Sequence, residues 1–338
     1  MIKSAEFCRV GHVDRLCDII SDALVDEFIK QDEFSRVAID VVGSHGIIYV
    51  IGEVSTKGYV DVPKIVKEVY REIGYKDEVG VMVNIVEQSP EIRDLANVGA
   101  GDSGIMVGYA TRETTEMLPL EVVICKRVCD WLDNYSFLGP DGKVQATIDY
   151  RGNGEFCEGL KTLVVSVQGK DEKYSLNDWY NNIDKPEIKR KEELTELLQK
   201  EFPCDDLRLT IFQKGGFDAD SGLTGRKNVL WYGPQVPTGG GAYAGKDPTK
   251  VDRSGAYWAR WFAKAWLKEH PEDNEALVKI AFAIGKNEAI MLTVNNKIIP
   301  TEEITVAKIL AQLDLRKPIY KQASILGHFG SNNFTWEN

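Results

Sequence analysis

The order of strand-like and helix-like segments recurs three times along this chain. In each recurrence, two runs of β-branched and apolar residues flank a turn that contains glycine with histidine or asparagine, and a segment with helical periodicity follows. The three units lie at 36–74, 144–202 and 276–313. A strand pair buries its apolar face when a helix packs on it. The recurrence therefore predicts an α+β fold of three similar two-layer strand-strand-helix domains in a pseudo-threefold arrangement.

Domain boundaries are expected from the same pattern. We predict repeat units at 1–115, 116–235 and 236–338, with segments interleaved between domains. In the third unit, Thr301 and the two glutamates after it are predicted to begin the helix. Between the units, "GAGDSGIMVGYA" is predicted to be a glycine-rich bend, and "GPDGKVQ" a turn that enters a strand.

Charge and composition exclude several classes of protein. The net charge of −11 argues against a nucleic-acid or membrane-surface partner, because such binding depends on basic patches. No apolar run is long enough to span a bilayer, and the first residues lack an apolar signal core, so we expect a cytoplasmic protein without a membrane partner. The six cysteines form no C-x-x-C pair, which predicts reduced thiols and no zinc site.

The run "GGGAYAGKDPTKVDRS", residues 239–254, combines glycines with lysines and aspartates. Glycines let a ligand approach the backbone, and cations beside carboxylates are typical of an anion bound together with a metal ion. The run predicts a nucleoside polyphosphate site. It is not a P-loop, since Gly245 and Lys246 are followed by Asp247 and Pro248 instead of the serine or threonine that holds magnesium.

A distributed set of basic residues is able to hold the several charges of a polyphosphate, although each one taken singly is more often a solvated surface charge. The set is Lys143, Arg226, Lys227, Lys246 and Lys250. Asp14 and Asp252 complement it as magnesium ligands, because hard cations prefer oxygen. The spacing of Asp252 favours an alternative role as the N-cap of the following helix. His12, in "VGHVDR", is placed to donate a hydrogen bond to a developing anion.

Taken in order, these segments resemble the S-adenosylmethionine synthetases, also called methionine adenosyltransferases. The resemblance runs from about Ser4 to Trp336, and it is most specific in "GLTGRK" and "GGGAYAGKDPTKVDRS". Further matching motifs are "GHVDRLCDIISDALVD", "GEVST", "IGY", "QSPEI", "GAGDSGIMVGYATRET", "PDGKVQ", "DSGLTGRK" and "GHFG". The fold of this family, three similar α/β domains with interleaved segments, agrees with the threefold pattern.

The resemblance implies a role for each matched residue. Catalysis is assigned to His12, Lys143, Arg226, Lys227, Lys246 and Lys250. Contacts with ATP are assigned to the same six residues and to Asp102 at the ribose, Asp141, and Phe212 at the adenine. Contacts with methionine are assigned to Glu53, Gln88, Asp220 and Lys250. Metal binding is assigned to Asp14 and Asp252 for Mg2+, to Asp40 for K+, and to Glu6 as a further acidic candidate.

The implied reaction is attack of methionine sulfur on C5′ of ATP, which displaces triphosphate; hydrolysis of the triphosphate then gives pyrophosphate and phosphate. A homodimer with sites at the subunit interface is implied, and a homotetramer is compatible with it. Two alternatives stay open: a non-catalytic regulatory relative that binds a partner subunit, and a different ATP-dependent phosphotransferase. Retention of His12, both aspartates and all five cations favours the enzyme.

The chain also departs from the family pattern. Val13 and Arg15 replace the usual proline and lysine of the first motif, and Asp40 is one methylene shorter than the usual glutamate. Ser103 replaces a glutamine, and Thr238 a histidine. Between "QSPEI" and "GAGD" only "RDLANV", residues 93–98, intervenes, where relatives commonly have a longer gating segment. We expect a shorter lid, weaker exclusion of water and easier product release.

Overall fold

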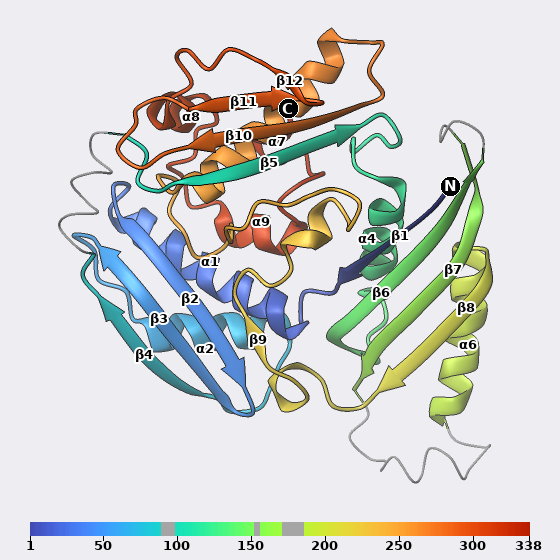
Figure 1. The fold of residues 1–338 in the computed structure, drawn as a ribbon. Coiled ribbons are helices and arrows are strands. Elements are labelled where there is room, and N and C mark those ends of the chain that lie inside the picture. Colours follow the sequence, from blue (N-terminus) through green and yellow to red (C-terminus); the bar gives the residue numbers. More distant parts are fainter. Residues whose placement is uncertain (89–98, 152–155, 171–185) are drawn as a thin grey trace.

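The protein contains three four-stranded sheets arranged around a central group of helices (Figure 1). The structure is a computed structural model, and it describes residues 1–88, 99–151, 156–170 and 186–338. None of the helices in these ranges combines the length and apolarity needed to cross a membrane. The α+β class predicted from the recurring units is confirmed.

The first sheet has the order β9-β2-β3-β4. Its strands are β2 (Arg36–Ser44), β3 (Ile47–Ser55), β4 (Gly80–Val86) and the short β9 (Gly222–Leu223). The predicted hairpin is confirmed: His45 and Gly46 form its turn with φ of 41° and 80°. Helix α2 (Val62–Ile73) begins at Asp61, whose side chain accepts a hydrogen bond from the Lys64 amide, and ends at Gly74 in the left-handed conformation.

The second sheet has the order β1-β6-β7-β8. Its strands are β1 (Ile2–Cys8), β6 (Leu138–Arg151), β7 (Phe156–Gly169) and β8 (Cys204–Phe212). Helix α4 (Leu120–Leu132) packs on β1 and β6, and α6 (Pro186–Glu201) packs on β8. The segment predicted as a turn entering a strand lies within β6, which has a register irregularity between Leu138 and Gly142.

The third sheet has the order β5-β10-β11-β12. Its strands are β5 (Gly104–Thr111), β10 (Glu275–Phe282), β11 (Met291–Val294) and β12 (Lys297–Ile298). Most of the predicted glycine-rich bend is in fact strand β5, because it pairs antiparallel with β10. Within it, Gly108 lets the backbone of α7 (Val251–Glu269) approach closely. Helix α8 (Val306–Gln312) begins after Thr305, which caps the Lys308 amide, and not at Thr301, since Glu303 interrupts the chain with a positive φ.

The three sheets follow one plan. A long helix precedes each antiparallel hairpin: α1 (Val13–Gln31) precedes β2, α4 precedes β6, and α7 precedes β10. The first strand of each hairpin also pairs with an antiparallel strand from a distant part of the chain. β2 pairs with β9, β6 with β1, and β10 with β5. In the first two sheets a crossover helix leads to a parallel fourth strand, whereas β12 follows β11 directly. Segments are thus exchanged between the units, and the boundaries at 115 and 235 remain a prediction.

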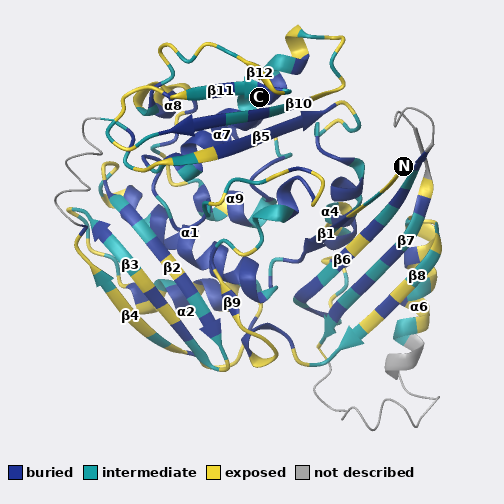
Figure 2. Ribbon diagram, in the orientation of Figure 1, coloured by how far each residue is buried: buried dark blue, intermediate teal, exposed yellow. Residues whose placement is uncertain are grey.

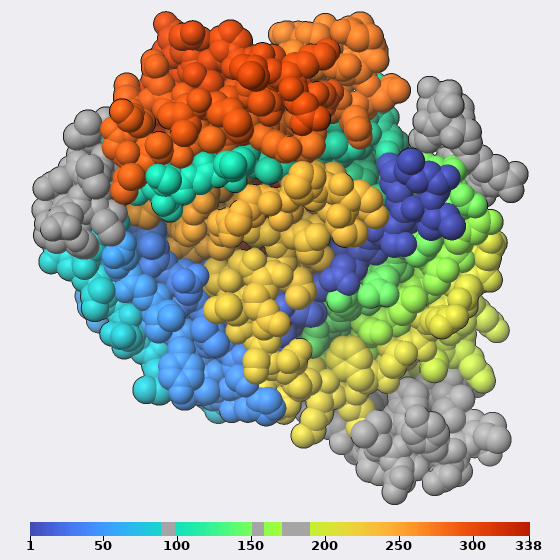
Figure 3. All heavy atoms as spheres, viewed as in Figure 1, coloured from blue at the N-terminus to red at the C-terminus, as the bar shows by residue number. Residues whose placement is uncertain are grey.

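Helix α1 lies in the middle of the molecule and is buried along most of its length (Figure 2). It packs against α2, β2, β9 and the short helix α9 (Tyr320–Leu326). Every residue from Val13 to Asp26 is buried, including charged ones. The segment between β8 and α7, coloured gold in Figure 3, crosses the surface of this face between the surrounding units. It carries most of the basic candidates singled out above.

Candidate active site

A cavity of about 330 Å³ opens where α1 begins, beside the start of β6 and the end of β8. It brings together five of the residues that the sequence singled out. It is lined by His12, Asp141, Gly142, Lys143, Ser166, Phe212, Lys214, Ala219 and Asp220. Lys214 is a cation that the motif analysis missed, although its position two residues after Phe212 offered a signal.

His12 is the N-cap residue of α1, and its Nδ1 accepts a hydrogen bond of 3.2 Å from the Asp14 amide. This contact leaves the imidazole proton on Nε2. Burial, assisted by the positive charge of Lys227, lowers the pKa of His12 to about 4. His12 is therefore a neutral hydrogen-bond donor at pH 7.

Asp141 shapes the same cavity. Its carboxylate accepts a hydrogen bond of 2.8 Å from the Gly216 amide, which fixes the loop that leads to Asp220. Burial raises the pKa of Asp141. The residue thus helps to position the part of the cavity wall that contains Ala219 and Asp220.

The predicted cations are each paired with a carboxylate. Lys143 Nζ lies 2.6 Å from Glu6 Oε2, Lys227 Nζ lies 2.6 Å from Asp14 Oδ2, and Lys246 Nζ lies 2.5 Å from Asp252 Oδ2. Arg226 Nε adds a 3.5 Å contact with Asp14, and Lys250 Nζ lies 3.9 Å from Asp247. A polyphosphate that arrives with divalent cations matches this arrangement, because phosphate oxygens suit the lysines and the metal suits the carboxylates.

The carboxylates fit magnesium only if phosphate supplies further ligands. Within the described residues, no group of three or more His, Cys, Asp or Glu side chains is arranged to hold a metal ion. Asp14 and Asp252 each offer a single carboxylate, and magnesium commonly binds one or two carboxylates together with phosphates and water. The expected capping role of Asp252 is wrong: Lys250 is the N-cap residue of α7, and Asp252 lies in the first turn with its carboxylate on Lys246.

The candidates for methionine and potassium lie apart from this cavity, except Asp220. Gln88 donates a hydrogen bond of 3.2 Å to Glu53, and Gln88 Oε1 is buried without a hydrogen-bond partner. Asp102 is exposed, and the neighbouring Ser103 accepts a hydrogen bond from the Ile284 amide, which ties this loop to the end of β10. Asp40 is exposed on β2. No hydrogen bond or ion pair joins Asp40 or Asp102 to the candidate cations among the described residues.

Arg15 of the first motif is outside the cavity. It is buried, and its guanidinium donates to the carbonyl oxygens of Cys8, Ser324 and Ile325 at distances of 2.7, 2.7 and 2.9 Å. It therefore joins the end of β1 to the last turn of α9. The predicted short lid at 93–98 lies outside the described residues, and it remains a prediction.

The three α+β units exchange strands, and their lysine–carboxylate pairs join β1 to β6 and join the segment between β8 and α7 to the first turns of α1 and α7. Family models of S-adenosylmethionine synthetase match nearly the whole chain: the N-terminal domain at 1–92, the central domain at 97–215 and the C-terminal domain at 214–338. The chain belongs to the S-adenosylmethionine synthetase family.

Several relatives support this assignment. The chain is 37% identical to an S-adenosylmethionine synthase of Thermus thermophilus, over 99% of this chain and 95% of the relative. It is 38% identical to that of Nitratiruptor, over 99% and 94%, and 36% identical to that of Aquifex aeolicus, over 99% and 96%. The likeness therefore extends across all three units.

Proposed function

We propose that the protein forms S-adenosylmethionine from ATP, methionine and water, and hydrolyses the displaced triphosphate to pyrophosphate and phosphate. The family relation gives the enzyme class, methionine adenosyltransferase. The observation that carries the proposal for this chain is the set of lysine–carboxylate pairs at Lys143, Lys227 and Lys246. A regulatory relative that only binds a partner subunit would have no use for the complete set.

The chemistry of the first step requires alignment and a stabilised leaving group. A thioether sulfur is nucleophilic and has no proton to lose, so attack on C5′ needs no general base. Negative charge grows on the departing triphosphate, and fixed cations bind this charge more strongly than they bind the ground state. Neutral His12 is suited to donate its Nε2 proton, as a hydrogen bond, to the oxygen that leaves C5′.

The phosphate contacts in this proposal come from Arg226 and the four candidate lysines. Magnesium, held by Asp14 and Asp252, would neutralise phosphate charge and orient the triphosphate. Phe212, at the end of β8 in the cavity wall, offers a ring face for adenine. The buried Oε1 of Gln88, which lacks a partner, suits the ammonium group of methionine. Other roles follow the resemblance: Glu53 and Asp220 for methionine, Asp102 for ribose, and Asp40 for potassium.

A homodimer with shared sites is part of the proposal. The outer face of the first sheet, away from α1, exposes a group of apolar side chains. Figure 2 shows exposed residues as yellow bands along the strands of this sheet. The members of the group are Tyr49, Ile51, Met82, Val86 and Leu223. Glu53 lies on the same face, because Tyr49, Ile51 and Glu53 are every second residue of β3, and side chains two residues apart in a strand point the same way. A second copy covering this face would bring its own candidates to Glu53. A tetramer would need a further interface.

A cytoplasmic location also belongs to this proposal. Five cysteines are free thiols in the structure, which suits a reducing compartment: Cys8, Cys17, Cys125, Cys129 and Cys204.

The test is incubation of the purified protein with ATP, methionine, Mg2+ and K+, followed by mass spectrometry for S-adenosylmethionine and a separate assay for pyrophosphate and phosphate. We expect all three products only when methionine and Mg2+ are present. Omission of K+ tests the role of Asp40. Formation of ADP or AMP would identify a different phosphotransferase, and ATP binding without any product would favour the regulatory relative.

A further inference from the structure

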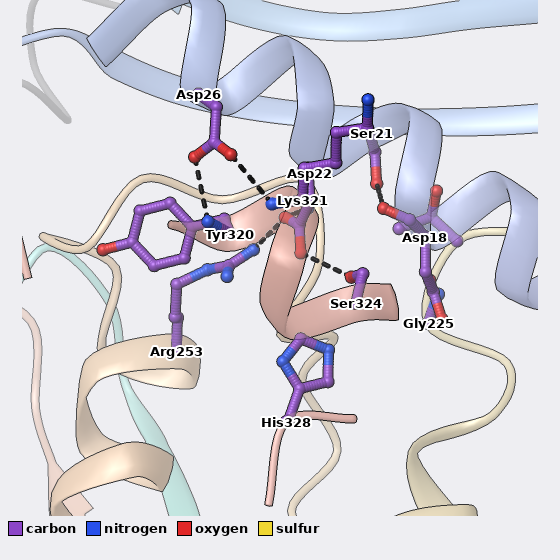
Figure 4. Close-up of polar contacts among 12 residues, drawn as sticks. Asp18, Ser21, Asp22, Asp26, Gly225, Arg253, Tyr320, Lys321, Ser324 and His328 are labelled. Atoms are coloured by element: carbon purple, nitrogen blue, oxygen red, sulfur yellow. Dashed lines mark hydrogen bonds and ion pairs between the residues drawn. The ribbon is translucent and has the colours of Figure 1, made fainter. Parts of the chain in front are cut away.

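Four aspartates recur at every fourth position of α1: Asp14, Asp18, Asp22 and Asp26. This spacing places them on one face of the helix, and each is at most 6% exposed. A buried carboxylate is costly unless hydrogen-bonded. Each of the four accepts a hydrogen bond from a backbone amide: Leu223 donates to Asp14, Gly225 to Asp18, Gly245 to Asp22 and Tyr320 to Asp26. Figure 4 shows the bond to Asp26 and the contacts of Asp22 with Arg253 and Ser324.

The two middle aspartates make the same contact in two loops. Gly225 donates its amide to Asp18 Oδ1 at 2.7 Å, and Gly245 donates its amide to Asp22 Oδ1 at 2.9 Å. Both glycines have left-handed φ angles, 81° and 78°. Each directly precedes a candidate phosphate ligand, since Arg226 follows the first glycine and Lys246 the second.

A side chain at either position would collide with its neighbours. A Cβ on Gly225 would lie 2.5 Å from Ala242 Cβ, and a Cβ on Gly245 would lie 1.9 Å from the Ile39 carbonyl oxygen. The glycines are therefore required where these loops pack against Ala242 and β2. The backbone orientation at each glycine determines the direction of the side chain that follows, Arg226 or Lys246. The hydrogen bond from the glycine amide to the aspartate fixes this orientation.

Asp26 offers a comparison on the same helix face. It accepts hydrogen bonds of 2.9 Å from the amides of Tyr320 and Lys321, at the start of α9. That helix carries no candidate site residue. Asp26 thus accepts backbone amide hydrogen bonds as Asp18 does, but the segment that it binds contains no candidate site residue.

We propose that Asp18 and Asp22 are positioning residues, whose carboxylates fix the Gly225 and Gly245 amides and so orient Arg226, Lys227 and Lys246 toward one triphosphate. The inference rests on the proposed function. It adds that α1 positions the phosphate-binding loops, besides supplying His12 and Asp14 to the site. Asp22 also binds Arg253 and Ser324, so its removal disturbs the core more widely. Asp18, with fewer contacts, gives the cleaner test.

The experiment compares Asp18→Ala with Asp26→Ala. Each removes a buried acceptor of backbone amide hydrogen bonds, so we expect both to lower the unfolding temperature. Both are assayed well below their unfolding temperatures, for synthesis and for hydrolysis of added tripolyphosphate. We expect Asp18→Ala to lower kcat for both reactions about 10- to 100-fold with KM for methionine changed less than about threefold, and Asp26→Ala to leave kcat unchanged.

Asp18→Asn supplies the rescue. Its amide oxygen can still accept from Gly225, and it resembles the neutral carboxyl that burial favours by raising the pKa of Asp18 to about 8. We expect Asp18→Asn to recover most of the lost kcat. Equal kcat values for folded Asp18→Ala and Asp26→Ala would overturn the inference, and so would failure of Asp18→Asn to recover activity.

Two further measurements keep the outcome clear. If Asp18→Ala does not fold, Asp18→Ser replaces it, because the serine hydroxyl remains polar but ends one bond short of the Gly225 amide; normal kcat in that variant would overturn the inference. If the unaltered protein makes no S-adenosylmethionine, the proposed function fails. Calorimetric binding of tripolyphosphate with Mg2+ then tests the positioning directly: weaker binding in the Asp18 variant supports it, and equal binding overturns it.

Discussion

At the scale of single residues, the site keeps its charges by pairing them. Lys246 and Asp252 are partly exposed, with 24% and 15% of their side chains accessible, and they neutralise each other at 2.5 Å. Lys143 and Glu6 form a similar, partly exposed pair, whereas Lys227 pairs with Asp14, which is buried. A partly exposed pair can open at small cost when a ligand offers phosphate to one member and a metal to the other, because exposed ion pairs are weak.

Lys246→Ala removes one of these cations. We expect kcat for synthesis to fall about 10²- to 10³-fold, since one fixed donor to the growing negative charge is lost, while thermal stability changes little. Turnover is measured by mass spectrometry and unfolding by calorimetry. Lys308→Ala is the control, because Lys308 is 56% exposed and lies on α8. Near-normal turnover of Lys246→Ala would remove the leaving-group role of Lys246.

Arg15→Lys restores the residue usual in the family, yet we expect it to destabilise this protein. A lysine ammonium cannot reach all three carbonyl oxygens that the planar guanidinium binds at Cys8, Ser324 and Ile325. The expected loss is about 2 kcal/mol, seen as a lower unfolding temperature, with kcat at low temperature unchanged. Arg71→Lys, at a 59% exposed position, should have no effect. An unchanged unfolding temperature in Arg15→Lys would contradict this assignment.

Motifs in the sequence suggested most of the candidate site residues, but they did not reveal the aspartates at 18 and 22. A charge at every fourth position of a helix is typical of a solvated face, whereas here β9, β2 and α9 pack around α1. Asp252 shows the opposite error: its place before an apolar helical run predicts a cap, whereas the helix already begins after Lys250, so Asp252 lies inside its first turn.

At the scale of elements, local patterns predicted the hairpins and their crossover helices. Alternating residues in 36–54 and the glycine at 74 determine β2, β3 and α2 without reference to distant contacts. The added strands were harder to predict. β5 is glycine-rich and β9 has only two residues, and each is a strand because a distant hairpin edge supplies its hydrogen bonds.

The C-terminal 3-10 helix (Thr335–Glu337) is a further element held by distant residues. Glu337 is 2% exposed and accepts hydrogen bonds from Arg260 and Lys264 of α7. We expect Glu337→Gln to lower stability by about 3 kcal/mol, because two buried cations lose their counter-charge. Thermal unfolding checks this result. Glu303→Gln, 80% exposed, serves as the control, and equal unfolding temperatures for the two variants would contradict the expectation.

At the scale of the whole molecule, the outer face of the first sheet, away from α1, exposes apolar side chains. Ile51 lies on that face of the first sheet, opposite Asp40 and Asn84. If a second copy covers it, Ile51→Asp places a charge in an apolar interface, so we expect a monomer with strongly reduced turnover. Light scattering after gel filtration measures the mass.

Ile298→Asp is the matched control for the interface. Ile298 is 85% exposed on β12, in a different sheet, and its replacement should leave both mass and turnover unchanged. If Ile51→Asp is still a dimer, the copies associate through another surface. If it is a monomer with normal turnover, each chain works alone.

The exchange of strands between sheets also affects how the chain can fold during synthesis on a ribosome. β1 emerges first, but its partner β6 begins at Leu138, and the second sheet is complete only after Phe212. The first sheet waits for Leu223 and the third for Ile298. At about 5–20 residues per second, about 10 to 40 s pass before any sheet can close. During that time the nascent chain presents open strand edges, so its native state is reached late.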